Sequence, residues 1–131
     1  MNICLTAIAN TLNSQLDSRF GRCNYFIIQD PEKTNFKPIK NELTKVSERA
    51  GVLAAQLLAD NKVKHVITGN VGSRAMQALK NVGIEVSIER NITIKDAIAK
   101  FRSGKIIKTN TPTVCGYTLS SQDTSNGIWR V

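Results

Sequence analysis

Cysteine, histidine and long apolar runs are all scarce in this chain of 131 residues. The three cysteines, Cys4, Cys23 and Cys115, are odd in number and widely spaced, which argues against a disulfide framework and favours a reducing compartment. No stretch of about 18 apolar residues occurs, and the first residues lack the basic start of a secretory signal. We therefore expect a cytoplasmic protein without a membrane span.

Aromatic, acidic and histidine side chains are too few for several classes of function. Aromatic residues make up 5% of the chain, which leaves few stacking platforms for single-stranded nucleic acid. With a single histidine, a Ser–His or Cys–His pair would have to use His65. A two-metal nuclease needs several carboxylates on its central strands, but residues 61–84 contain neither Asp nor Glu. We expect a protein that is not an enzyme.

The composition that remains is that of a folded, basic domain. The chain is 41% hydrophobic and 21% charged, which is ordinary for a globular protein. Its formal net charge of +8 favours an anionic partner. Residues 1–108 are expected to form one domain. Residues 109–131 are rich in Thr, Ser, Asn and Gly and are expected to form a flexible C-terminal tail.

The first third of the chain has the pattern of an antiparallel meander. Strands are predicted at residues 3–9, 25–30 and 34–41, where apolar and β-branched residues concentrate. Pro31 ends the second of these strands and fits the second position of a turn, while Pro38 suggests that the third strand lies at an edge.

The rest of the chain alternates between helical and strand patterns. Apolar residues recur at helical spacing after Ser47, a plausible N-cap, again between Ala75 and Gly83, and again after Thr93, which with Asp96 forms a capping box. Strands are predicted at residues 63–69 and 84–88. Right-handed crossovers then give a mixed α/β fold with a five-stranded sheet of order 3-2-1-4-5, strand 2 antiparallel, and three helices.

Two loops are predicted to meet where the first and fourth strands end. Ligands of open α/β sheets gather at the carboxyl ends of strands where the connections diverge. One loop covers residues 10–22, and the other is GNVGSR at 69–74, which precedes a helix. Gly69 and Gly72 allow a close turn, and free N–H groups at a helix start favour an anion. A G-x-x-G turn before a helix also serves ordinary connections, so this motif alone leaves both interpretations open.

The sequence also resembles a known family, the dinitrogenase iron-molybdenum cofactor biosynthesis proteins, which include NifX, NafY and the C-terminal part of NifB. The resemblance rests on FGRCNYF at 20–26 followed by Asp30, and on the block at 51–86 with its small-residue helix, apolar strand and glycine turn. It covers about residues 1–107. It implies a ribonuclease H-like sheet and a role in nitrogen fixation, because better-studied members bind or carry iron–sulfur precursors of the nitrogenase cofactor.

The residues of the first loop allow two interpretations. Arg19 and Arg22 could hold an anionic cluster through charge-assisted hydrogen bonds, and Cys23 could be a soft metal ligand. The family often has histidine where this chain has Arg19. Alternatively, Phe20 fills the core, Gly21 supplies a positive φ, Arg22 braces a neighbouring loop and Cys23 is a small buried hydrophobe.

The leading functional hypothesis is a carrier for an anionic iron–sulfur or iron-molybdenum-type cofactor, or for its precursor. Its expected binding residues are Arg19, Phe20, Gly21, Arg22, Cys23, Gly69, Asn70, Gly72, Ser73 and Arg74, with Cys23 as the metal ligand. A cofactor-assembly or acceptor protein is the expected partner. The alternatives are a nucleic-acid or general anion-binding module, whose affinity would fall steeply with salt, and an interaction domain that docks through Ile128 and Trp129.

Three further residues have predicted places but weaker functional signals. Cys4 lies within the first strand and is expected in the core. Cys115 lies in the predicted tail, where it would be either a second soft ligand or a reactive thiol. His65 is expected at the surface end of its strand, because Lys62 and Lys64 flank it and no second histidine stands at ligand spacing.

Overall fold

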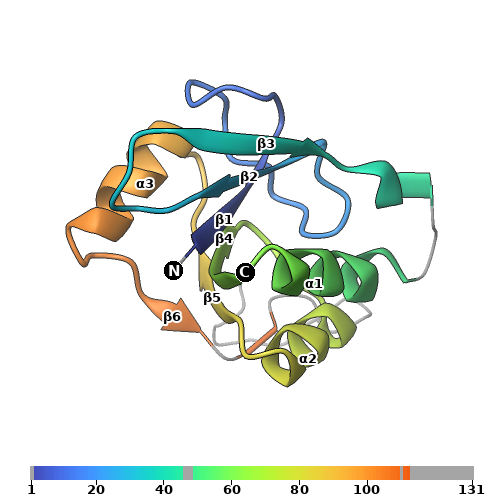
Figure 1. Ribbon diagram of the computed structural model, residues 1–131. Helices are drawn as coiled ribbons and strands as arrows, with labels where there is room; N and C mark the ends of the chain where they lie inside the picture. Colours follow the sequence, from blue (N-terminus) through green and yellow to red (C-terminus); the bar gives the residue numbers. More distant parts are fainter. Residues whose placement is uncertain (1, 46–48, 110, 113–131) are drawn as a thin grey trace.

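The computed structural model describes residues 2–45, 49–109 and 111–112, which form one sheet with helices on both faces (Figure 1). In chain order the elements are β1 (Asn2–Ala7), β2 (Tyr25–Gln29), β3 (Phe36–Lys40), the 3-10 helix η1 (Glu42–Lys45), α1 (Ala50–Asp60), β4 (Val63–Thr68), α2 (Ser73–Asn81), β5 (Glu85–Ile88), α3 (Ile94–Arg102) and β6 (Lys108–Thr109). Within these ranges, none of the helices has the length and apolarity that crossing a membrane requires.

The predicted strand order is confirmed, with one addition. The sheet has six strands in the order β3-β2-β1-β4-β5-β6. Neighbours β1, β4 and β5 run parallel, whereas β2, β3 and β6 pair antiparallel with their neighbours. The sequence missed β6 because two residues are too few to show a strand period. This strand also spans the predicted boundary between residues 108 and 109.

The sheet is buried on both faces. Helices α1 and α2 cover one face and α3 covers the other (Figure 1). In β1 the side chains alternate, so that Ile3 and Leu5 belong to the core cluster beneath α3, while Cys4 belongs to the cluster beneath α1 and α2. Cys4 is therefore a core residue, as predicted. Burial raises the pKa of its thiol well above the ordinary value.

The helix starts were predicted with mixed success. Helix α3 begins as expected, because the backbone N–H of Asp96 donates to Thr93 Oγ1 at 3.1 Å. Helix α1 begins at Ala50, and its N-cap residue Arg49 makes no capping hydrogen bond through its side chain. The predicted cap, Ser47, lies outside the described residues, as do Cys115, Ile128 and Trp129.

The surface position predicted for His65 is wrong. Its side chain is 3% exposed, and Nε2 lies 2.7 Å from Ser87 Oγ on the neighbouring strand. The ring of Phe101 from α3 covers it edge-on at 5.2 Å between centroids. Side chains alternate along a strand, so Lys64 is exposed and His65 is buried. The neighbouring lysines had led to the prediction of a surface position. Burial lowers the pKa of His65.

Candidate functional site

The parallel strands β1, β4 and β5 end at the same edge of the sheet, and the loops that follow them are bonded together there. The backbone N–H of Phe20 donates to Asn70 O at 3.2 Å, and that of Leu16 donates to Ile92 O at 2.9 Å. We call residues 14–20, 69–70 and 89–92 the rim. The predicted meeting of the first loop with the glycine turn is therefore confirmed.

Gly69 lies where the first two loops press against each other. A Cβ added to Gly69 would lie 2.5 Å from the Cα of Ser18, a distance that real Cβ contacts do not reach. Asn70 then pairs with Arg19 in a short parallel bridge. The glycine that the sequence singled out at the start of GNVGSR is thus required for contact between the two loops.

Phe20 and Gly21 fasten the first loop to the core. Phe20 is 8% exposed and packs edge-on against Phe26, with ring centroids 6.4 Å apart. Gly21 has φ of +86°, and a Cβ there would lie 2.9 Å from the Cα of Gly51 in α1. The structure thus places both residues in packing roles, as the second interpretation of the loop has it.

Cys23 lies in the interior, in a position unsuited to metal binding. Its side chain is fully buried, and burial raises the pKa of the thiol to about 12, with the nearby Asp17 carboxylate adding to the rise. A cysteine binds a metal as the thiolate, and the metal must be able to reach its sulfur. Among the described residues, no three His, Cys, Asp or Glu side chains gather as a metal site. We therefore leave Cys23 out of the site, although the sequence suggested it as a ligand.

Asp17 fixes the position of Arg19 at the rim. The Asp17 side chain is 3% exposed, and it accepts hydrogen bonds from Arg19 Nε at 3.0 Å and from a terminal guanidinium nitrogen at 2.9 Å. It also accepts the backbone N–H of Arg19 at 3.0 Å. The Arg19 side chain is 57% exposed. A planar guanidinium is therefore held in one orientation with part of its surface open to solvent.

Arg90 is a rim residue that the sequence analysis missed. It follows β5 and donates from one terminal nitrogen to Asn70 Oδ1 at 2.8 Å and to Gly69 O at 3.2 Å. These bonds tie the third loop to the glycine turn. The signal was available in principle, because the loop after a third parallel strand must leave from the same edge as the other two.

Arg19 and Arg90 line one groove of about 520 Å³ on the rim. The groove also contains two acidic side chains, Asp17 and Glu89. Asp17 is paired with Arg19, and Glu89 is paired with Lys100 at 2.8 Å. The charge of Arg90 remains uncompensated by any ion pair in the described part of the chain, so the groove favours an anion.

Of the predicted binding residues, Arg19 lines the groove and the others do not. Gly72 is the N-cap of α2, and Ser73 and Arg74 are exposed in its first turn. Arg22 is exposed beyond the buried Gly21. The structure thus brings Arg19, Gly69 and Asn70 together as predicted and adds Arg90.

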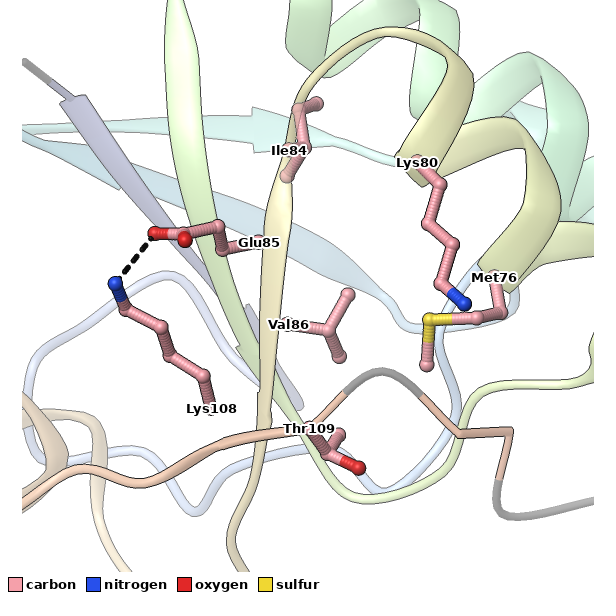
Figure 2. A pocket seen from close by; sticks show the side chains of 7 residues that line it. All are labelled: Met76, Lys80, Ile84, Glu85, Val86, Lys108 and Thr109. Atoms are coloured by element: carbon pink, nitrogen blue, oxygen red, sulfur yellow. Dashed lines mark ion pairs between the residues drawn. The ribbon is translucent and has the colours of Figure 1, made fainter.

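A second cavity, of about 360 Å³, lies between α2 and the strands β5 and β6 (Figure 2). Met76 and Lys80 reach from α2 toward Val86 and Thr109, while Glu85 and Lys108 form an ion pair of 3.0 Å across β5 from them (Figure 2). Loops from separate strands do not converge here as they do at the rim. The rim is therefore the better candidate for a cofactor site.

Comparison with known proteins agrees with the resemblance found in the sequence. The family described as dinitrogenase iron-molybdenum cofactor matches residues 1–104. An uncharacterized protein of Methanocaldococcus jannaschii is 31% identical over 99 residues, which are 73% of this chain and 84% of that protein.

Two solved structures share the fold. The apo form of the orange protein from Desulfovibrio gigas superposes with a TM-score of 0.82 at 32% identity, covering 85% of this chain and 94% of that one. A NifB-like protein from Thermotoga, solved by NMR, superposes with a TM-score of 0.75 at 28% identity, covering 92% and 98%. The mixed sheet of this chain is thus shared with these proteins, while the finer likeness to ribonuclease H stays a prediction. The chain belongs to the dinitrogenase iron-molybdenum cofactor family.

Proposed function

We propose that this protein binds an anionic metal–sulfur cofactor, of the iron–sulfur or iron-molybdenum type, or a precursor of it, and carries it without catalysing a reaction. The family description supports a link to such a cofactor. The observation that carries the proposal is the groove in which Arg19 and Arg90 lie together, each fixed by hydrogen bonds to neighbouring rim residues.

Binding in this groove would depend on charge and hydrogen bonds. Guanidinium N–H groups donate well to anionic acceptors, and such bonds are about twice as strong as neutral ones. Because Asp17 and Asn70 already hold the two arginines, little side-chain freedom is lost when the anion arrives. The proposed contacts are Arg19 and Arg90, which line the groove. Gly69 and Asn70 hold Arg90 and the two loops in place, while Phe20 and Gly21 shape the first loop.

A cofactor held without a protein–metal bond can be released intact, which suits a carrier. The expected partner is therefore a protein that supplies or accepts the cofactor. Ile8 lies at the groove with its side chain 50% exposed, and it offers such a partner an apolar contact beside the cationic groups.

The test is loading of purified protein under anaerobic conditions with ferrous iron, sulfide and molybdate. We expect wild type to retain visible absorbance and metal after gel filtration. Arg90→Gln should weaken retention by about tenfold to a hundredfold, since a hydrogen bond to a charged group contributes about 1.5–3 kcal/mol.

Lys64→Gln is the matched control, because Lys64 is exposed on β4 and its loss removes the same charge away from the groove. It should load like wild type. Equal loading of Arg90→Gln and Lys64→Gln would contradict the proposed site, and no loading of wild type would contradict the proposed function.

A further inference from the structure

A second feature lies at the opposite edge of the sheet from the rim, at the end of β2. Gln29 pairs with Ile3 near the start of β1, and its side chain is buried with 3% exposure. Its Nε2 donates to Lys33 O at 3.2 Å and to Thr34 O at 3.3 Å, bracing the β2–β3 turn. These two carbonyl acceptors fix the orientation of the amide, because the flipped form would set Oε1 against them.

Gln29 Oε1 is therefore a buried acceptor of known orientation, and it has no hydrogen-bond partner within the described ranges. Buried polar atoms in native proteins nearly always have a partner, so each exception requires an explanation. No other side-chain nitrogen or oxygen of the described residues is buried and unpartnered in this way.

Gln29 also forms part of the wall of a cavity of about 310 Å³ between α3 and the β2–β3 turn. The apolar part of the lining is Leu12, Ile98 and Ala99, and the cationic part is Lys95 and Arg102. No acidic side chain lines it. An apolar floor with a few convergent polar groups is the usual make-up of a small-molecule site.

The two cationic side chains of the cavity, Lys95 and Arg102, differ in how firmly hydrogen bonds hold them. Arg102 is engaged with the turn, donating from Nε to Pro31 O at 2.6 Å and from a terminal nitrogen to Lys33 O at 2.8 Å. Lys95 forms no ion pair with the described acidic residues and is exposed at the cavity. A carboxylate in the cavity would therefore find a flexible ammonium group and a fixed guanidinium.

We propose that this cavity binds a small acylated amino acid, a molecule that has a carboxylate, an amide N–H and an apolar side chain. The carboxylate would pair with Lys95 and Arg102, and the apolar group would cover Leu12, Ile98 and Ala99. Gln29 Oε1 is closed to solvent in the free protein, so it would accept the ligand N–H once a side chain of the cavity lining moves aside. The site is separate from the rim, so the result of its binding test does not depend on the proposed cofactor function.

The probe is N-acetyl-leucine, titrated into the isotope-labelled full chain while backbone amide shifts are followed by NMR. We expect saturable shifts confined to the amides of Leu12, Gln29, Thr34 and residues 95–102. The analogue 4-methylpentanoate lacks the N–H donor and should bind about tenfold more weakly, and N-acetyl-leucine methyl ester, which lacks the charge, should also bind more weakly.

The protein-side variant is Lys95→Gln, with Lys64→Gln as the matched control on β4. Lys95→Gln should weaken N-acetyl-leucine binding by about tenfold, whereas Lys64→Gln should leave it unchanged. Gln29 also braces the β2–β3 turn, so replacing it would disturb folding. Its acceptor is therefore tested by comparing N-acetyl-leucine with 4-methylpentanoate, which lacks the N–H donor. The proposal would be overturned if no saturable shifts appeared or if they fell on other residues. It would also be overturned if 4-methylpentanoate bound as tightly as N-acetyl-leucine, or if Lys95→Gln bound N-acetyl-leucine as tightly as wild type.

Discussion

Replacing Phe20 with alanine is expected to lower the free energy of unfolding by about 3 kcal/mol, the largest effect of any single change at the rim. Phe20 is 8% exposed and contacts Phe26 of β2, so its removal leaves a cavity beneath the first loop. The loop cannot close that cavity, because Gly21 already lies against the backbone of α1. Urea unfolding followed by circular dichroism measures the loss.

Two controls separate packing from other effects of this substitution. Phe20→Leu keeps most of the volume and should cost less than about 1.5 kcal/mol. Phe36→Ala removes the same ring from β3, where Phe36 is only partly buried, and should cost less than Phe20→Ala. Phe20→Ala within about 1 kcal/mol of wild type would show that the phenylalanine does not anchor the loop.

Gly69→Ser is expected to separate the two loops of the rim. A Cβ at this position would lie 2.5 Å from the Cα of Ser18, so backbone must move. Overpacking of this kind costs about 1–3 kcal/mol, and here it also displaces Asn70, to which Arg90 is bonded. We therefore expect a lower melting temperature and weaker cofactor loading together.

Gly72→Ser is the matched control for Gly69→Ser. A Cβ at Gly72 meets nothing within 4 Å, and the residue is the N-cap of α2, where serine is favoured. This variant should be as stable as wild type or slightly more so. If Gly69→Ser and Gly72→Ser had the same melting temperature, the contact between Gly69 and Ser18 would not matter for the stability of the fold.

The strand order could be predicted because each step had a local signal. Pro31 ends β2, Thr93 caps α3, and right-handed crossovers leave few arrangements of the parallel strands. Strand β6 gave no such signal, since two residues carry no period. The flexible tail predicted for residues 109–131 stays a prediction, because nearly all of it lies beyond the described residues.

The site was harder to predict than the fold. The meeting of the loops followed from topology, and the glycine at position 69 marked it. The burial of Cys23 could not be inferred, because a cysteine that binds metal and a cysteine that fills a core look alike in a sequence. Arg90 was missed because its bond to Asn70 spans 20 positions and depends on the shared edge of β4 and β5.

The central claim is that the rim holds an anionic cofactor by charge, without the thiol of Cys23. The most direct measurement is the metal-to-protein ratio after anaerobic loading with ferrous iron, sulfide and molybdate, compared between Cys23→Ser and the double variant Arg19→Gln/Arg90→Gln. We predict that Cys23→Ser, if folded by circular dichroism, loads like wild type, and that the double variant loads almost nothing. Loss of metal from Cys23→Ser together with normal loading of the double variant would contradict the claim.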